Sequence, residues 1–368
     1  MTHLERWKAA LNRGSFDRLP RFYAATREFT ESLEKYLGAD IDSILHKQFI
    51  IDLRQQAGSE GNIEPKSWSP QYAGPEMRKW EDGSVSNIWG SRQKLMFHRG
   101  GKGAYTETYK YALEGDLSIA DIENHAWPDP DWYDYTSFIP ALEKYPDYPF
   151  HVGYWAIGWF SWEVRGMQQC LLDFALDPKA ADAMTTKIAD IGFEYFKRLL
   201  AAVKPYIGKN VVAIHIADDW GMQDGLLMGP DIFDKFYARH YRRFSDLAHS
   251  HGLKVEFHSC GAARELYPKF IDVGVDIMNP VQTSAKGMVP HEIKAEYGRD
   301  LCFSGGVDVQ QLLPTATAAR VKDEVKYLIE SLGKDGGYLI GPAHNIQVGT
   351  PHENVIAMYQ AMDEYYGI

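Results

Sequence analysis

From residue 149 onward, short apolar runs alternate with long helical patterns, and this alternation constrains the fold more than any other feature of the sequence. Such alternation is typical of a parallel sheet assembled from βα units. It predicts six strands, at 150–155, 211–216, 253–258, 276–278, 301–304 and 338–340. It also predicts helices at 178–203, 230–250, 262–273, 314–332 and 351–366. The chain is therefore expected to be an α/β protein.

Two apolar runs nearer the N-terminus, at 18–23 and 48–53, supply the strands that an eight-stranded barrel still lacks. The remainder of residues 1–148 is irregular, with turns such as the one that contains Pro128 and Pro130. A chain of 368 residues can hold one α/β barrel with insertions. We expect a single domain over residues 1–368. It would be a (β/α)8 TIM barrel with an elaborated N-terminal region at 1–148 and regular βα units at 149–368.

Charge and cysteine content exclude several kinds of partner and location. Lys and Arg number 39 against 50 Asp and Glu, a formal net charge of −11, so a nucleic-acid partner is not expected. The three cysteines, Cys170, Cys260 and Cys302, do not form a disulfide framework, which favours a reducing compartment. No signal-like start and no run of about 18 apolar residues is present. We expect a cytoplasmic protein that acts on a small molecule, with its oligomeric state open.

In a TIM barrel the active site lies where the strands end at their C-terminal side. Polar or glycine-rich turns follow four of the predicted strands, at 218–221, 258–261, 305–308 and 341–345. These turns are expected to face one mouth of the barrel, and their side chains are the candidates for a functional site.

His258 and Cys260 are the strongest candidates, because side chains two residues apart point to the same side of an extended chain. Imidazole and thiolate suit zinc, and a catalytic zinc site has three protein ligands and one open position. His344, in the last turn, is the candidate third ligand, and Glu256 has the same facing as His258. The alternative is a buried cysteine beside a hydrogen-bonded histidine, which is at least as common for such a pair.

The other candidates come from the same turns. Asp218 and Asp219 alternate in direction, so one of them is expected to point into the mouth and to orient substrate or a ligand, whereas a helix cap or turn is the alternative role. The aromatic run at 154–160 either lines the pocket or belongs to the core, and His215 is expected to be a core histidine. The side chains expected to contact substrate are Tyr154, Trp155, Trp220, Gln223 and Asn345.

At these residues the sequence resembles the uroporphyrinogen decarboxylase superfamily. The segment 337–346 followed by 350–355 looks like the closing strand, loop histidine and Thr-Pro-x-Glu-Asn helix start of that superfamily. The turns at 305–308 and 218–220 and the opening at 17–20 resemble its other motifs. The resemblance implies a (β/α)8 barrel with one of two chemistries, metal-free decarboxylation or zinc-dependent methyl transfer to or from a corrinoid.

The two branches differ at positions that this sequence contains. True decarboxylases carry Arg-Gln-Ala-Gly-Arg-Tyr soon after the first strand, whereas residues 23–27 read Tyr-Ala-Ala-Thr-Arg, and the similar run at 54–58 is out of place and has an extra Gln. The methyltransferase branch carries His-x-Cys where this chain has His258 and Cys260, with a second Cys where this chain has His344. The resemblance therefore implies a zinc site of two histidines and one cysteine, and a corrinoid carried by a partner protein.

Three hypotheses follow. The first is a zinc-dependent methyltransferase with His258, Cys260 and His344 as ligands and Asp219 orienting substrate. The second is a metal-free, decarboxylase-like enzyme that uses Asp218 or Asp219 together with His344 on a porphyrinogen or another acidic substrate. The third is a barrel that binds a corrinoid protein or a small ligand without turnover.

Overall fold

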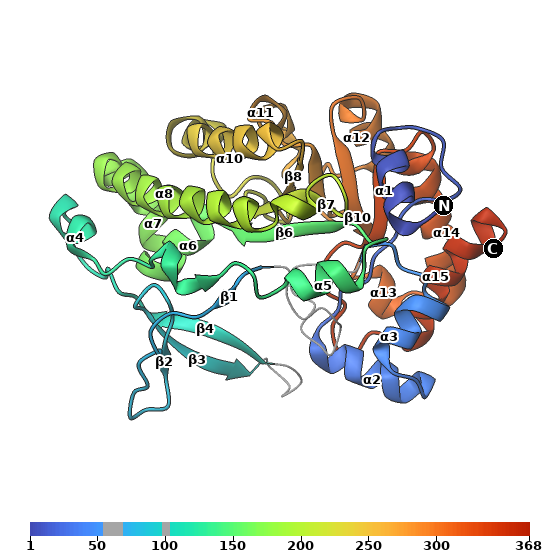
Figure 1. The fold of residues 1–368 in the computed structure, drawn as a ribbon, viewed down its shortest axis with the longest axis horizontal. Coiled ribbons are helices and arrows are strands. Elements are labelled where there is room, and N and C mark those ends of the chain that lie inside the picture. The colour runs from blue at the N-terminus through green and yellow to red at the C-terminus, as the bar shows by residue number, and fades with distance from the viewer. Residues whose placement is uncertain (54–68, 98–103) are drawn as a thin grey trace.

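The computed structural model describes residues 1–53, 69–97 and 104–368 (Figure 1). Its centre is a six-stranded sheet with the strand order β11–β10–β9–β8–β7–β6, in which all neighbours are parallel. The strands are β6 (Phe150–Trp155), β7 (Val211–Ala217), β8 (Lys254–His258), β9 (Ile277–Val281), β10 (Cys302–Val307) and β11 (Tyr338–Pro342). All six predicted strands are confirmed.

Two N-terminal segments continue this sheet and close it toward a barrel. Arg21 forms a parallel bridge with Ile340 of β11, and Phe22 forms a parallel bridge with Leu53. These are the runs predicted at 18–23 and 48–53, and they pair through isolated bridges rather than long ladders. The predicted TIM barrel is confirmed. The run at 54–58 lies outside the described residues.

Helices cover the outside of the sheet (Figure 1). The longest, α8 (Pro178–Ala202), begins where Asp177 accepts a hydrogen bond from the backbone N–H of Ala180 and where proline occupies the first helical position. The other regular helices of this half are α6 (Ile157–Arg165), α7 (Met167–Leu176), α9 (Pro230–Ile232), α10 (Ala238–Ser250), α11 (Tyr267–Asp272), α12 (Pro290–Tyr297), α13 (Leu312–Thr315), α14 (Ala318–Leu328) and α15 (His352–Tyr366). Two short 3-10 helices, η3 (Lys204–Tyr206) and η5 (Arg264–Leu266), and two π-helical turns, η4 (Phe233–Tyr237) and η6 (Ile329–Gly333), lie next to these helices.

One predicted helix is divided in the structure. The pattern at 314–332 predicted a continuous helix, but α13 ends at Thr315 and α14 begins at Ala318. Thr317 caps the new start, since its hydroxyl accepts a hydrogen bond from the backbone N–H of Arg320. A threonine favours such a capping position over a helix interior, so a local side-chain bond interrupts the predicted helix.

The N-terminal region is built from short elements, as predicted. An antiparallel sheet of β2 (Val85–Ser86), β3 (Arg92–Phe97) and β4 (Ala104–Lys110) projects from one side of the barrel (Figure 1). A second small sheet pairs β1 (Gln71–Tyr72) with β5 (Tyr133–Asp134). The helices of this region are α1 (His3–Leu11), α2 (Arg27–Leu37), α3 (Ile41–Ser43), η1 (Ile44–Gln48), α4 (Ile119–Asn124), η2 (Pro130–Trp132) and α5 (Ile139–Lys144).

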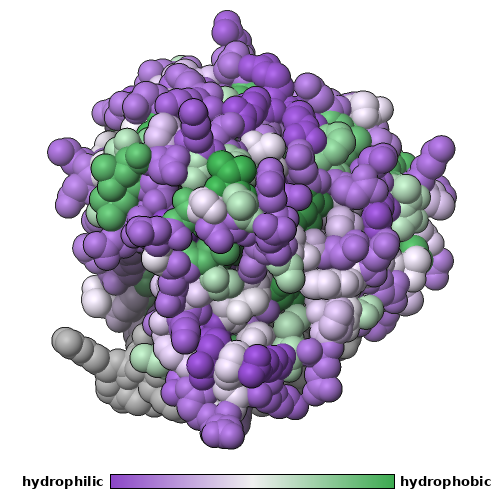
Figure 2. Space-filling view, turned by 90° about the vertical axis from the view of Figure 1, so that its left-hand side faces the viewer, coloured by the Kyte–Doolittle hydropathy of each residue, from purple (hydrophilic) through white to green (hydrophobic). Residues whose placement is uncertain are grey.

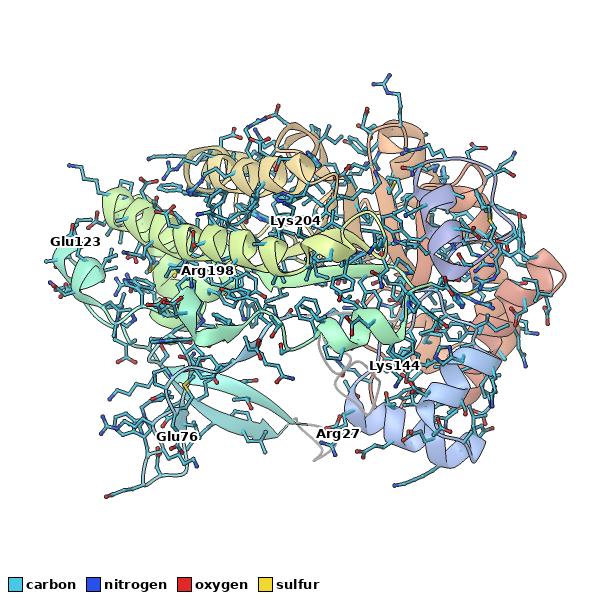
Figure 3. The ribbon with its side chains drawn as sticks, viewed as in Figure 1. Arg27, Glu76, Glu123, Lys144, Arg198 and Lys204 are labelled. Carbon is cyan, nitrogen blue, oxygen red and sulfur yellow. The ribbon has the colours of Figure 1, made fainter. Side chains whose placement is uncertain are left out.

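Ion pairs attach this region to the barrel. The carboxylate of Asp52 is completely buried and accepts hydrogen bonds from His3 (2.8 Å), Arg6 (2.6 Å) and Arg18. Burial alone would raise the pKa of Asp52, but these partners hold it below its usual range. On the outside, Arg198 of α8, which is labelled in Figure 3, pairs with Asp131 of η2.

The face of the molecule seen in Figure 2 is mostly hydrophilic. Figure 2 shows apolar groups scattered among polar ones on the side that carries α7, where Leu172 and Leu176 are exposed. Among the described residues, no helix combines the length and apolar character needed to span a membrane.

Candidate metal centre

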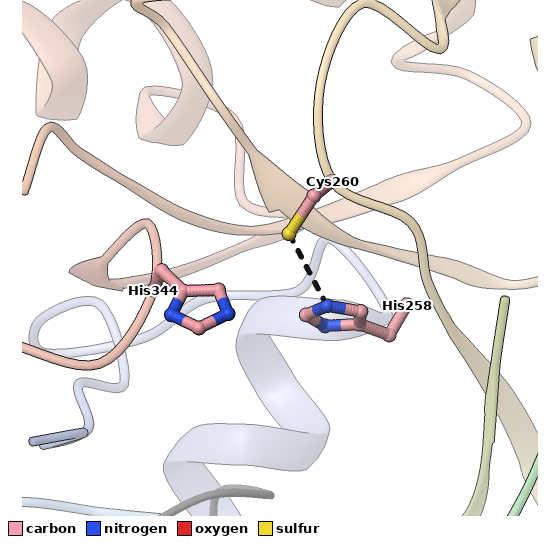
Figure 4. Close-up of side chains that lie close together, drawn as sticks. All are labelled: His258, Cys260 and His344. Carbon is pink, nitrogen blue, oxygen red and sulfur yellow. Dashed lines mark hydrogen bonds between the residues drawn. The ribbon is translucent and has the colours of Figure 1, made fainter. Parts of the chain in front are cut away.

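The three predicted ligands lie together at one mouth of the barrel (Figure 4). His258 is the last residue of β8, Cys260 follows it by two residues, and His344 follows β11. Their ligand atoms all lie within 4.8 Å of one another. Since β9 and β10 separate β8 from β11 in the sheet, the curvature of the barrel is what allows this approach.

The spacing of the donor atoms suits a metal ion with tetrahedral coordination. The Sγ atom of Cys260 is 3.4 Å from Nε2 of His258. Zinc bonds of about 2.0–2.3 Å to nitrogen and sulfur place two tetrahedral ligands roughly 3.5 Å apart. The ring centroids of His258 and His344 are 6.2 Å apart and the rings are tilted by 65°. Two imidazoles and one thiolate leave a fourth position for a substrate atom.

The environment of Cys260 favours a cation. Burial raises the pKa of its thiol, Asp219 raises it further, and the hydrogen bond with His344 acts in the opposite direction without reversing the shift. A thiol in this environment stays protonated unless a positive charge compensates its burial. A bound divalent metal supplies that charge and would convert the thiol into a thiolate ligand.

Two side chains set the positions of these ligands. Asn279 of β9 lies beside His258, with its Oδ1 atom 2.7 Å from Nδ1 of the imidazole. Asp219 accepts a hydrogen bond of 3.0 Å from the backbone N–H of Cys260. Asp219 is half-buried, and its hydrogen bond with Cys260 places its carboxylate next to the candidate metal centre, where an orienting role was predicted for it.

Asp218 faces the helical shell instead. Its carboxylate accepts hydrogen bonds from the backbone N–H groups of Ile157 and Trp159, both at 2.8 Å, and from the hydroxyl of Tyr241 at 2.6 Å. Burial raises the pKa of Asp218 to about 6, although these hydrogen bonds oppose the shift. Asp218 therefore caps α6, which was the alternative to a catalytic role for this residue.

Glu256 is engaged inside the barrel, below the candidate metal centre. One carboxylate oxygen lies 2.9 Å from Nδ1 of His151 and 2.8 Å from Nδ1 of His215. Burial alone would raise the pKa of Glu256, but the two imidazoles hold it well below its usual range. The group of residues whose atoms could share a metal does not include Glu256, so its position differs from the one predicted for an additional ligand.

His151 was missed in the sequence. It is buried in β6, and its Nε2 atom accepts a hydrogen bond of 3.1 Å from the indole N–H of Trp7. His215, which was predicted to be a core histidine, is buried but belongs to this polar cluster. The signal was available in principle, because a histidine in a buried strand requires polar partners, but their identity depends on the register between strands.

The aromatic side chains predicted to contact substrate lie in two different environments. Tyr154 is half-buried, and its ring stacks on that of His215 with centroids 5.9 Å apart. Trp155 and Trp220 are buried, the first donating its indole N–H to Ile188 of α8 and the second packing on Phe233. Both tryptophans therefore belong to the packing between sheet and helices rather than to the mouth.

A cavity of about 670 Å³ opens beside the candidate metal centre. Asn345 lines it, and the exposed Gln223 lies 3.4 Å from another lining side chain, Gln282. No lysine or arginine occurs among the described residues of its wall. The lining residues are Cys260, Gln282, Asp308, Val309, Gln310, Pro314, Ala343, His344, Asn345, Gln347, Val348, Gly349 and Thr350.

A protein-family model and one solved structure agree with this architecture. Residues 162–365 match the family model of uroporphyrinogen decarboxylase (URO-D). Among solved structures, a methyltransferase from Methanosarcina mazei is similar with a TM-score of 0.68 and 17% identity, covering 100% of this chain and 99% of that one. A 3-keto-D-glucoside 4-epimerase from E. coli has a TM-score of 0.40 and 11% identity, over 70% of this chain and 99% of that one. No curated protein matches the sequence.

Proposed function

Because this chain belongs to the uroporphyrinogen decarboxylase family, we propose that it is a zinc-dependent methyltransferase of that family. The observation that carries the proposal is the convergence of His258, Cys260 and His344, whose ligand atoms lie within 4.8 Å of one another. The fold shared with a solved methyltransferase over the whole chain is consistent with this choice.

The three side chains would hold zinc and leave one position open to substrate. When bound, zinc acts as a Lewis acid on a thiol or on the oxygen of a methyl donor. The carboxylate of Asp219, fixed by the backbone N–H of Cys260, would orient the polar group of the substrate. The methyl group would pass between that substrate and a corrinoid carried by a partner protein.

The composition of the cavity wall argues against a porphyrinogen substrate. Several carboxylates in one ligand require arginine or lysine side chains to bind them, and the described wall contains neither. Four of the described side chains of the wall are amides, those of Gln282, Gln310, Asn345 and Gln347. Metal-free decarboxylation remains the second hypothesis. It predicts that carbon dioxide release survives the substitution Cys260→Ser. Methyl transfer that depends on zinc would be lost in the same variant.

Metal analysis of protein purified without a chelator tests the proposal. The wild-type protein should hold about one zinc per chain, whereas Cys260→Ala and His344→Ala should each lose it. Cys302→Ala is the matched control, because Cys302 is a buried cysteine of β10 whose thiol donates to the carbonyl oxygen of Leu11. Less than about half an equivalent in the wild type, unchanged in Cys260→Ala, would contradict a zinc enzyme.

A further inference from the structure

Asn279 occupies a distinctive position in the barrel wall. It pairs directly with His258 in the register of β8 and β9, and only 7% of it is exposed. Its Oδ1 atom lies 2.7 Å from Nδ1 of His258, and its Nδ2 atom donates to Oγ of Ser304 in β10 at 2.9 Å. Three consecutive strands therefore supply a connected row of polar side chains next to the candidate metal centre.

The hydrogen bond determines which nitrogen of His258 carries the proton. An amide oxygen only accepts hydrogen bonds, so Nδ1 must donate and must therefore hold a hydrogen. In a neutral imidazole the lone pair is then on Nε2. Nε2 is the atom that lies 3.4 Å from the sulfur of Cys260. The hydrogen bond that His258 donates to Asn279 thus leaves the metal-facing nitrogen free to act as a ligand.

The hydrogen bond from Asn279 to Ser304 holds the amide group beside His258. Ser304 is completely buried, and its Oγ atom accepts the hydrogen bond from the amide group of Asn279. If the amide were reversed, its NH2 group would face Nδ1 of His258, and the imidazole would have to carry its hydrogen on Nε2 instead. A hydrogen on Nε2 would prevent coordination.

We propose that Asn279, held by Ser304, is a positioning residue that selects the metal-binding tautomer of His258. This inference rests on the proposed zinc site. Carbonyl and carboxylate partners of this kind fix the ring orientation of metal-bound histidines and increase their basicity, and their removal typically weakens metal binding about 10- to 100-fold. The backbone of Asn279 also accepts a hydrogen bond from the N–H of Ser259 at 2.7 Å, and side-chain variants should keep this backbone contact.

The test measures zinc affinity in the full-length protein by competition with a chromophoric chelator. Asn279→Ala should bind zinc about 10- to 100-fold more weakly than the wild type. Asn279→Asp should stay within about threefold, because its carboxylate accepts the same hydrogen bond from Nδ1. Ser304→Ala should lose affinity by a smaller factor, since the amide remains but is less firmly held.

Asn210→Ala is the matched control. Asn210 is similarly buried, and its side chain donates a hydrogen bond of 2.8 Å to the carbonyl oxygen of Leu142. Asn210 directly precedes the start of β7, so it lies at the opposite end of the barrel from the candidate metal centre. This variant should lose a comparable amount of thermal stability and keep the zinc affinity of the wild type. The visible spectrum of the cobalt-substituted proteins gives a second readout, because altered coordination by His258 shifts the absorption bands.

Three results would overturn the inference. The first is an Asn279→Ala protein that binds zinc as tightly as the wild type and Asn210→Ala. The second is an equal loss in Asn279→Ala and Asn279→Asp, because a tautomer-selecting contact must be rescued by the carboxylate. If Asn279→Ala does not fold, unchanged zinc affinity in Ser304→Ala would count against the inference. A wild-type protein without zinc affinity would refute the proposed function itself, so the two failures are distinguishable.

Discussion

The clearest consequence of the buried thiol at residue 260 is a steep dependence of zinc binding on pH. Zinc binds the thiolate, so each zinc that enters the site must displace the proton of Cys260. Burial raises the pKa of this thiol above its ordinary value, which is about 8.5. From pH 7 to pH 8 the thiol is therefore almost wholly protonated without metal. The apparent zinc affinity should rise about tenfold over this interval.

The zinc affinity should increase with pH because the pKa of the Cys260 thiol is raised. Because the pKa is raised, the proton is held more firmly at neutral pH, and the affinity increases until the pH passes the thiol pKa. Cys260→Asp is the matched variant, since its carboxylate is an anionic ligand that has already lost its proton at neutral pH. This variant should bind zinc more weakly than the wild type and with much less change between pH 7 and pH 8.

Competition titrations at several pH values give the slope. Calorimetry in buffers of different ionisation enthalpy gives the number of protons released, which should be about one per zinc for the wild type. Equal slopes for the wild type and Cys260→Asp would refute the assignment of Cys260 as a ligand, because the proton released would then come from another group. A wild-type zinc affinity that does not change with pH would also refute the assignment of Cys260 as a ligand.

Three further predictions address other parts of the molecule. His344→Cys should retain about one equivalent of zinc whereas His344→Ala should lose it, as metal analysis can show, because thiolate and imidazole are both zinc ligands. Gln310→Lys, in the cavity wall, should increase the binding of thioglycolate relative to 2-mercaptoethanol about tenfold in cobalt-substituted protein; Gln311→Lys, outside the wall, should not. Because burial raises the pKa of Asp218 to about 6, its contribution to stability is fully present below about pH 4 and is lost as the pH rises through 6. Urea unfolding should show a loss of roughly 3 kcal/mol in the wild type over this interval, and no such loss in Asp218→Asn.

The barrel and the pairing of His258 with Cys260 were accessible from the sequence because both depend on local rules. The strands are short apolar runs between helices, and the strand ends of a barrel meet at one mouth. His258 and Cys260 share a side because they lie two residues apart. His344 joins them from a strand that is distant in the sheet order, which only the expectation of a closed barrel could suggest.

The orientation of the aromatic and acidic residues beside the mouth was less accessible. Alternation shows that adjacent residues point to opposite sides of a strand, but it does not show which side is the interior. Asp218 faces α6 and Asp219 faces Cys260, and either assignment was open in the sequence. The locations of Trp155 and Trp220 were open for a different reason, because a large aromatic side chain suits a ligand pocket and a helix interface equally well.

Glu256 shows most clearly where sequence reasoning ends. Its spacing of two from His258 gives both side chains the same facing, yet they lie in successive layers of the barrel interior. The register places Glu256 opposite His215 of β7, whereas His258 pairs with Asn279 of β9. A carboxylate at the level of two imidazoles becomes their shared hydrogen-bond acceptor, while an imidazole one layer higher keeps a nitrogen free for a metal. The same facing thus leads to different chemistry, because the partners of each residue are set by neighbouring strands that the local sequence does not contain.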